Sequence, residues 1–494
     1  MEKNIATASL NVARPAWTSA RLVPRIVHLG CGAFHRAHQA FYTHQLLANS
    51  DSDWGICEVS LMPGNSTGMI ATLKAQNFLY CVAEQDATDT QLTVIGAIKE
   101  ALHPETDGCE SILHAMTRPE TAIVSLTITE KGYCFDAFRG QPDFTHPLIQ
   151  HDLVSPERPQ SAVGYIVEAL RRIRQSGQQP FSVLSCDNLR ENGRVTQAVV
   201  LGLAHARDPD LAKWIAAHVT FPSTMVDRIV PASTEESRRH VALRLGADDP
   251  LAVTCEPYRQ WIIEDNFVKG RPAWDRVGAQ FVTDVVPYEM MKLRMLNGSH
   301  SFLAYLGCLD GYDTIAATLS HPAYSKAVLA LMLKEQAPTL KLPYDYDLQN
   351  YAQTLLRRFT NAALKHSTEQ IAADGSQKLP HRLLDSVRYH LAHGSECALL
   401  MLGVTAWMCY VSRTNEQGMP VKVVDPLTEQ LAAIVKQSLD TEASVRSLLA
   451  LEQVFGSDLP ADLRFVNGVL KTYRRLKETG AKATVLSILT ASEN

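Results

Sequence analysis

Strand-like and helix-like segments alternate through the first half of the chain, and this pattern constrains the fold most. The strand-like runs are RIVHLG (25–30), WGICEVSL (54–61), NFLYCVAE (77–84), LTVIGAI (92–98), TAIVSLTIT (121–129) and FSVLSCDN (181–188). Segments of helical period stand between several of them, and YIVEALRRIRQSG (165–177) ends in a glycine, as many helices do. This alternation predicts an α/β fold of the Rossmann type, with a mostly parallel sheet and helices on both faces.

The pattern changes near residue 286. Beyond that point the apolar runs have helix length and helical period, as in YEMMKLRMLNGSHSFLAYLG (288–307) and FVNGVLKTYRRLKETG (465–480). A chain of 494 residues is also too long for one core. We therefore expect a Rossmann-type, NAD-binding domain over 1–285 and a mainly α-helical substrate and catalytic domain over 286–494.

Composition excludes several classes of protein. The net charge is −5, with charged residues making up 20% and hydrophobic residues 46% of the chain, so neither nucleic acid nor an anionic membrane is an expected partner. The ten cysteines stand singly without a CxxC pair, which favours a reducing, cytoplasmic location over a disulfide framework. The apolar run CALLMLGVTAWMCYV (397–411) is short for a bilayer span of ~20 residues and predicts a buried helix.

The first strand runs into a glycine turn, GCGAFHRAH (30–38). Gly30 and Gly32 permit a tight turn and close approach to a pyrophosphate, which the following helix N-terminus favours. The candidate cofactor-binding residues are Gly30, Gly32, Ala33, Phe34, His35 and Arg36. The second strand ends in Leu61 and Met62 without an acidic residue or a cation, so NAD is favoured over NADP by default.

The same loop raises a second possibility, because His35, His38 and His44 are metal-binding side chains. His35 and His38 are three residues apart and would share a helix face, but no carboxylate or cysteine nearby completes a recognisable ligand set. We therefore expect no metal site and interpret these histidines as residues that shape the loop and pack locally.

In the second half, KLRMLNGSHSF (292–302) holds the most informative polar residues. On an α-helix of about 100° per residue, Lys292, Asn297 and His300 fall at about 0°, 140° and 80°, within one half of the helix. Lysine can act as a general acid or base, asparagine can donate to a developing oxyanion, and histidine can bind a substrate hydroxyl or orient the lysine. The alternative is a solvated lysine with polar neighbours.

Three further residues stand at or near predicted strand ends. Glu130 follows TIT and could relay a proton, or it could simply be a turn carboxylate. Asn188 ends SCDN and could supply a second amide donor. Asp227, flanked by apolar residues in FPSTMVDRIVP, either pairs with Arg228 or binds a substrate hydroxyl.

Taken together, these segments are more specific than each alone. GCGAFHRAHQ, TITEKGY, SCDN, TMVDRIVP, EPYRQWIIEDNF, KLRMLNGSHS and DGSQKLP occur in this order over residues 30–380. The set resembles the long-chain mannitol dehydrogenase family of polyol and sugar-acid oxidoreductases. The resemblance implies metal-free NAD(H) chemistry at a site between the two domains. It also implies roles for individual residues: Lys292 as the general acid/base, Asn297 and Asn188 at the oxyanion with His300 beside them, Glu130 on the proton path, and Asp227, Glu289 and Lys378 in the substrate pocket.

The sequence departs from the mannitol-using pattern at two positions. Gln370 and Ala373 stand where that branch is expected to have an arginine and a histidine, which favours an acidic substrate. A carboxylate needs a cation, for which Lys378 is the first candidate and Arg259 and Arg382 are weaker ones. The expected reaction is NAD-dependent interconversion of a keto sugar acid and its hydroxy acid, by a monomer or small homo-oligomer. A polyol dehydrogenase, a nucleotide-sensing regulator without catalysis and a zinc alcohol dehydrogenase remain alternatives.

Overall fold

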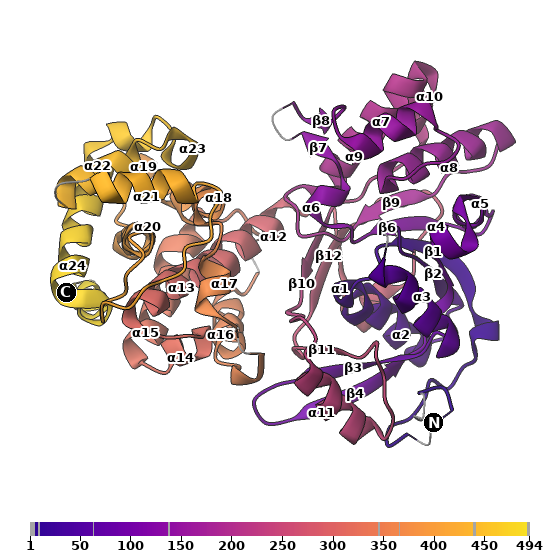
Figure 1. Ribbon diagram of the computed structural model, residues 1–494, viewed down its shortest axis with the longest axis horizontal. Coiled ribbons are helices and arrows are strands. Elements are labelled where there is room, and N and C mark those ends of the chain that lie inside the picture. Colours follow the sequence, from indigo (N-terminus) through magenta and orange to yellow (C-terminus); the bar gives the residue numbers. More distant parts are fainter. Residues whose placement is uncertain are drawn as a thin grey trace. The chain divides into compact units, whose positions relative to one another are not determined.

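The structure is a computed structural model that describes residues 5–7, 10–62, 64–136, 139–343, 346–364, 366–437 and 441–491. The chain divides into two compact units, Met1–Val286 and Pro287–Asn494, and each is considered by itself. The described strands lie in the first unit, whereas the second is built mainly of helices (Figure 1). The predicted fold class, an α/β Rossmann-type domain followed by a mainly helical one, is confirmed.

A parallel sheet forms the centre of the first unit. Its strands are β1 (Val23–Leu29), β2 (Trp54–Val59), β5 (Ile98–Leu102), β6 (Ile123–Leu126) and β9 (Ser182–Ser185). They lie in the order β5-β2-β1-β6-β9 with parallel neighbours. The central strand is β1, and the strand order reverses there, because β2 and β5 lie on one side of it and β6 and β9 on the other. Such a switch point is where doubly wound sheets bind ligands.

Alternate residues of β1 enter two different cores. Val27 and Leu29 pack with α5, α8 and α9, whereas Ile26 packs with α1 and α2 on the other face (Figure 1). This two-sided burial explains why most residues of the parallel strands are apolar on both faces, with buried polar exceptions such as His28 of β1 and Glu58 of β2.

Two of the predicted strands lie outside the parallel sheet. β3 (Tyr80–Gln85) and β4 (Thr90–Ile95) pair antiparallel across a short turn, and β11 (Val253–Cys255) adds to β3. A third sheet contains β10 (Thr224–Asp227), β12 (Gln260–Glu264) and β13 (Gln280–Val282), and a small ribbon contains β7 (Phe135–Asp136) and β8 (Gln141–Pro142).

The remaining elements of the first unit are helices. They are η1 (Ser19–Arg21), α1 (Ala33–Ala37), α2 (Gln39–Asn49), α3 (Asn65–Ala75), α4 (Pro104–Asp107), α5 (Cys109–Thr117), α6 (Thr129–Gly132), α7 (Pro147–Val154), α8 (Ala162–Ser176), α9 (Asn192–Arg207), α10 (Pro209–His218), α11 (Glu235–Leu245) and η2 (Trp274–Val277). The sequence predicts one helix from the glycine loop to about Asn49, but the helix is interrupted at His38. This residue leaves the helical conformation (φ −124°, ψ −91°) and places Nε2 3.1 Å from the Gln260 carbonyl oxygen.

The second unit follows as a series of helices. They are α12 (Val286–Met291), η3 (Lys292–Gly298), α13 (Ser299–Asp310), α14 (Ile315–Leu319), α15 (Pro322–Ala330), η4 (Leu331–Gln336), η5 (Ala337–Thr339), α16 (Leu348–Phe359), η6 (Ala362–Leu364), α17 (Thr368–Ala372), α18 (Gly375–Leu379), η7 (Pro380–Leu384), α19 (Asp385–His393), α20 (Ala398–Tyr410), α21 (Thr428–Gln437), α22 (Thr441–Leu449), α23 (Glu452–Phe455), η8 (Leu459–Ala461) and α24 (Leu463–Ala491). Three of these, η3, η4 and η7, are π-helical.

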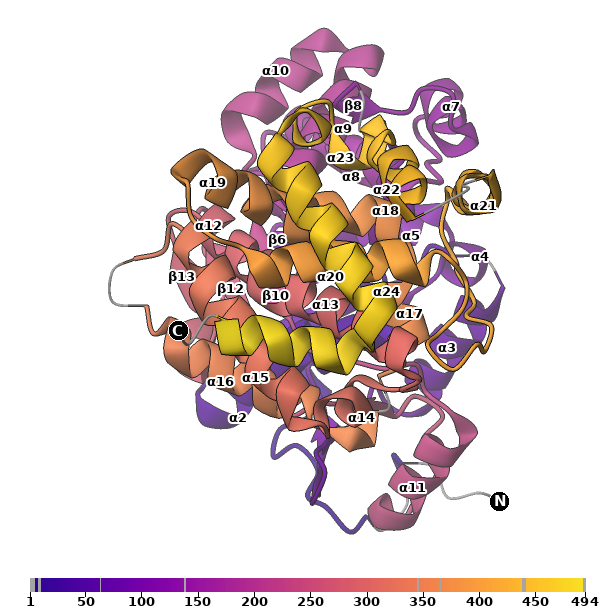
Figure 2. The same cartoon turned by 90° about the vertical axis from the view of Figure 1, so that its left-hand side faces the viewer.

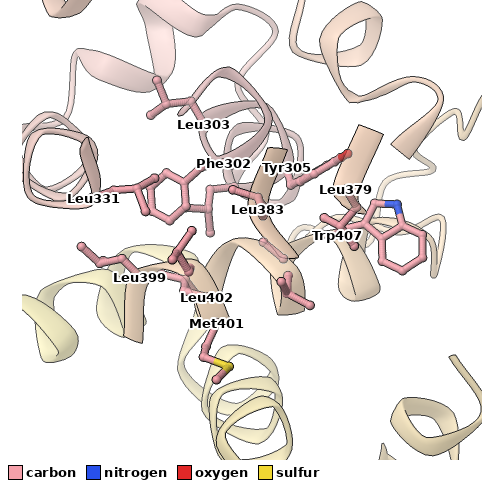
Figure 3. Close-up of a cluster of buried hydrophobic side chains, with 14 of the residues drawn as sticks. Phe302, Leu303, Tyr305, Leu331, Leu379, Leu383, Leu399, Met401, Leu402 and Trp407 are labelled. Atoms are coloured by element: carbon pink, nitrogen blue, oxygen red, sulfur yellow. The ribbon is translucent and has the colours of Figure 1, made fainter. Parts of the chain in front are cut away.

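The core of the second unit surrounds α20, the predicted buried helix, whose residues are buried from Leu399 to Tyr410. Figure 3 shows Phe302 of α13, Leu383 of η7 and Leu402 of α20 meeting in this core. The last helix, α24, also packs on α20 and bends at Gly480, where φ is +80° (Figure 2). No helix in the described ranges has both the length and the apolar character needed to cross a bilayer.

Candidate functional site

The two glycines of the turn after β1 differ in backbone conformation and in the space around them. Gly30 has φ of +114°, and a Cβ there would lie 2.1 Å from the Thr127 carbonyl oxygen of the adjacent β6 segment. Gly32 has φ of −79°, and the nearest atom to its Cβ would be the Gly30 oxygen at 4.0 Å. The fold therefore requires glycine at position 30, whereas position 32 is exposed and open on its protein side. An open, side-chain-free backbone at the start of a helix suits a dinucleotide pyrophosphate.

The residues that follow divide into two groups. Ala33 and Phe34 are partly exposed beside the turn, whereas the side chains of His35 and Arg36 are buried in the protein. The Arg36 guanidinium donates to the Leu251 carbonyl and lies 5.6 Å from the centre of the Tyr80 ring. These contacts support a role for His35 and Arg36 in holding the turn against the sheet, with Gly32, Ala33 and Phe34 presented outward.

His35 occupies the position at which a Rossmann turn commonly has its third glycine. Its ring stacks on that of His28 from β1, with centroids 3.4 Å apart, and its Nε2 pairs with the carboxyl of Glu58 from β2. All three side chains are buried. Burial raises the pKa of Glu58 to about 7 and lowers the pKa of both histidines to about 3, so the imidazoles are neutral at pH 7.

His28, His35 and Glu58 also form a candidate metal-binding set, which the sequence analysis did not identify because the three residues are far apart in the chain. Their ligand atoms lie within 4.8 Å of one another. The two rings are only 15° from parallel, however, and nitrogen lone pairs lie in the ring plane, so stacked rings cannot both direct a nitrogen at one ion. His28 also places Nδ1 2.8 Å from Ser125 Oγ and Nε2 2.8 Å from Thr127 Oγ1. The geometry suits a hydrogen-bonded core cluster better than a metal.

Asp187 joins the two loops that carry Glu130 and Asn188. Its buried carboxylate accepts hydrogen bonds from the backbone N–H of Ile128 (3.0 Å) and of Thr129 (2.9 Å), and from the Tyr133 hydroxyl (2.7 Å). Glu130 and Asn188 are themselves exposed at the carboxyl ends of β6 and β9, which are neighbours in the sheet. The structure thus brings these two predicted residues to one edge. The sequence signal for Asp187 was a carboxylate directly after a buried strand.

Asp227 ends β10 and is buried, with an exposed fraction of 4%. The neighbouring Arg228 guanidinium pairs with Glu84 and donates to the Ala37 carbonyl at 2.6 Å, so it connects β10 to the glycine-loop helix. Asp227 lies opposite Gln260 in the β10–β12 ladder, the residue whose carbonyl binds His38. Asp227 therefore lies close to the helix that follows the glycine turn.

In the second unit, Lys292 and Asn297 lie on a π-helix, η3, rather than on an α-helix. A π-helix joins residues i and i+5 by its backbone hydrogen bonds, so residues five apart stand one turn above each other. The prediction of an α-helix at this segment is therefore wrong, and the angle of about 140° between Lys292 and Asn297 does not apply. Asn297 follows Lys292 by one π turn, and His300 follows Asn297 by three residues at the start of α13.

Lys292 and His300 are buried, with exposed fractions of 9% and 8%. The His300 ring packs 4.2 Å from the Phe359 ring, measured between centroids, and its Nε2 has no hydrogen-bond partner among the described residues. Burial, reinforced by the charges of nearby His366, Arg382 and Arg358, holds the pKa of His300 well below its usual value. A neutral imidazole can accept or donate a hydrogen bond to a substrate hydroxyl.

The other predicted pocket residues of this unit lie close by in the chain or in space. Glu289 precedes Lys292 by three residues and is partly buried at the end of α12. Lys378 of α18 donates to the Ala373 carbonyl at 2.5 Å. Arg382 of η7 donates through Nη1 to the Asn297 carbonyl at 3.3 Å and so contacts the predicted catalytic segment directly.

Comparison with known proteins identifies the family. A family model described as the mannitol dehydrogenase Rossmann domain matches residues 24–276, and one described as the mannitol dehydrogenase C-terminal domain matches residues 284–477. The chain belongs to the mannitol dehydrogenase family. Both halves of this family's architecture are present, which confirms the resemblance inferred from the ordered motifs.

Individual members of the mannitol dehydrogenase family are similar over almost the whole chain. D-mannonate oxidoreductase of Escherichia coli K12 is 60% identical over 98% of this chain and 99% of its own length. Mannitol 2-dehydrogenase of Pseudomonas fluorescens, solved as a ternary complex with NAD and D-mannitol, is 39% identical with a TM-score of 0.81 and 96% of each chain covered. A substrate-free D-sorbitol dehydrogenase is 34% identical with a TM-score of 0.90, covering 95% of this chain and 96% of the other.

Proposed function

We propose that this protein is an NAD-dependent oxidoreductase that interconverts a keto sugar acid and its hydroxy acid, with D-fructuronate and NADH giving D-mannonate and NAD as the leading case. The 60% identity to D-mannonate oxidoreductase carries this proposal, because it exceeds the 34–39% identity to the solved polyol dehydrogenases. Gln370 and Ala373, which depart from the mannitol-using pattern, support it independently.

The glycine turn fits the cofactor. NAD(H) supplies the hydride donor or acceptor when bound, and we place its pyrophosphate over Gly32 at the start of α1. The residues at the end of β2, Leu61 and Met62, offer no cation to a 2′-phosphate, which favours NAD over NADP.

The proposed chemistry uses lysine and amide side chains. In ketone reduction, Lys292 donates a proton to the substrate oxygen as that oxygen gains negative charge, and it accepts the proton in the reverse direction. The amides of Asn297 and Asn188 donate hydrogen bonds to the same oxygen. His300 binds a neighbouring hydroxyl, and Glu130 connects the lysine to solvent protons. Asp227, Glu289 and Lys378 are assigned to the substrate pocket.

A substrate panel tests the function. We expect NADH oxidation with D-fructuronate and NAD reduction with D-mannonate, and much lower rates with D-fructose and D-mannitol. Turnover of the neutral pair with no activity on the sugar acids would make the protein a polyol dehydrogenase instead. NADH binding without turnover of any of these compounds would favour a nucleotide sensor, and activity lost on strong chelation would favour a metal enzyme.

Replacing Lys292 tests the mechanism. Lys292→Ala should lose most of kcat while the Kd for NADH, measured by fluorescence, stays close to that of the wild type. Turnover near the wild-type rate would refute the role of Lys292. A cytoplasmic location, which suits the ten free cysteines, and a monomeric or small homo-oligomeric state belong to the same proposal.

A further inference from the structure

Arg382 is placed beside the proposed catalytic segment with part of its guanidinium unused. Its Nη1 donates to the Asn297 carbonyl at 3.3 Å and to Ser301 Oγ at 3.0 Å. A guanidinium carries five N–H donors, so the edge formed by Nε and Nη2 remains. That edge presents two parallel N–H groups, which match the two oxygens of a carboxylate. The residue is partly exposed, so a ligand can reach it.

The charge of Arg382 is not balanced by a nearby acid. Among the residues that the structure describes, no carboxylate lies within ion-pair distance of its guanidinium, whereas Arg228 and Arg259 both pair with Glu84. A largely enclosed cation without a counter-charge is costly to the fold. It is retained more readily where a ligand supplies the negative charge.

Lys378, the cation favoured by the sequence, is already engaged. Its ammonium lies 2.5 Å from the Ala373 carbonyl oxygen, 3.5 Å from that of Ile371 and 4.0 Å from the Asp374 carboxylate. Burial, followed by the charge of Arg382, lowers the pKa of Lys378. Lys378 is therefore held by its own helix start and adds a second positive charge near Arg382.

We infer that Arg382 binds the substrate carboxylate through its Nε–Nη2 edge and thereby selects sugar acids over neutral polyols. This inference rests on the proposed function. One guanidinium then does two things: Nη1 fixes the carbonyl of Asn297, and the opposite edge fixes the acidic end of the substrate. A hydroxyl of the same substrate can then bind the Nε2 of His300, which has no hydrogen-bond partner among the described residues. Asn297 and the carboxylate are thus positioned by the same planar group.

The test compares two ligands that differ at one end, D-mannonate with a carboxylate and D-mannitol with a hydroxymethyl group. Binding of each to the enzyme–NADH complex is measured by NADH fluorescence for the wild type, Arg382→Gln and Arg382→Lys. We expect Arg382→Gln to weaken D-mannonate binding about 30-fold or more and to change D-mannitol binding little. Arg382→Lys keeps the charge without the paired edge and should fall between the two. Lys378→Gln compares the two neighbouring cations and should weaken D-mannonate binding less than Arg382→Gln does, because the Lys378 ammonium is already engaged by the Ala373 carbonyl.

The outcomes separate three cases. If the wild type prefers D-mannitol, the proposed function fails before Arg382 is tested. If the wild type prefers D-mannonate and Arg382→Gln keeps that preference, the assignment of Arg382 is overturned. If both ligands weaken in proportion in Arg382→Gln and Arg382→Lys, Arg382 only supports the Asn297 backbone, and the inference is also overturned. Melting temperatures of the variants show whether each one folds.

Discussion

Replacing Gly32 by alanine separates the proposed cofactor-binding role of the glycine turn from its role in folding. Gly32 has φ of −79° and ψ of 171°, which any L-residue adopts, and beyond its two chain neighbours the nearest atom to an added methyl would be the Gly30 oxygen, at 4.0 Å. An alanine at this position therefore causes no steric clash in the free protein. The variant should be as stable as the wild type, or more stable by about 0.4–1 kcal/mol, because alanine lowers the conformational entropy of the unfolded chain.

The substitution should instead weaken the binding of NADH. A methyl group placed where a pyrophosphate approaches the backbone acts as overpacking, which costs about 1–3 kcal/mol. That corresponds to a Kd for NADH raised by about 5- to 150-fold. The assay is titration by NADH fluorescence, with the melting temperature of the free protein measured in parallel.

Gly30→Ala is the contrasting variant. Its φ of +114° is unfavourable for alanine, and its Cβ would lie 2.1 Å from the Thr127 oxygen, a backbone atom that cannot move aside easily. Strained backbone and overpacking together cost about 2–6 kcal/mol, so this variant should melt at a clearly lower temperature. The reasoning is refuted if Gly32→Ala binds NADH within twofold of the wild type, or if Gly30→Ala melts at the wild-type temperature.

Three further variants test other parts of the molecule. Asn297→Ala should lose about 10²- to 10³-fold in kcat as an oxyanion donor, and an effect mainly on KM would assign it to substrate binding instead. Asp187→Ala strips three donors of their acceptor at about 1–3 kcal/mol each, so both melting temperature and kcat should fall, and an unchanged kcat would separate Asp187 from the site. Burial raises the pKa of Glu335 from 4.5 to about 7, so the folded state binds the extra proton and stability falls as pH rises from about 4.5 to 7, by up to about 3 kcal/mol. Glu335→Gln should flatten this pH dependence of the melting temperature, and an identical profile in both proteins would contradict the assignment.

Local sequence patterns predicted individual strands of the first unit well, because the pattern of each strand lies within that strand. Mainly apolar runs bounded by turns identified β1, β2, β6 and β9, because a strand buried on both faces carries few polar residues. The same runs could not show which strands pair. Residues 80–95 are as strand-like as the others, yet they form the antiparallel pair β3–β4 outside the central sheet because a short turn connects them, whereas Ile98, the last residue of the same predicted run, begins β5 of the central sheet.

The features that sequence reasoning missed depend on residues distant in the chain. His35 stands where a third glycine was expected. The packing that accounts for a histidine there forms only when β1 and β2 bring His28 and Glu58 against it. The π-helical turn at Lys292 was also missed, because apolar periodicity over one or two turns does not distinguish four-residue from five-residue hydrogen bonding. Asp187 was overlooked beside Asn188, since its three donors come from another strand end.

The three π-helical segments of the second unit meet at one point. A Cβ on Gly298, at the end of η3, would lie 2.6 Å from the Arg382 carbonyl oxygen in η7 and 2.7 Å from Gln336 Nε2 in η4. Each widened turn leaves carbonyls turned away from the helix ladder, and side chains bind two of them: Arg382 binds Asn297, and His390 binds Glu335. The π-helical spacing of Lys292 and Asn297 therefore depends on the packing of η4 and η7 against η3, and not on η3 alone. A residue inserted or deleted in η4 or η7 would disturb the packing of η3 without changing the sequence of η3, so length changes in these distant segments are constrained as tightly as substitutions in η3 itself.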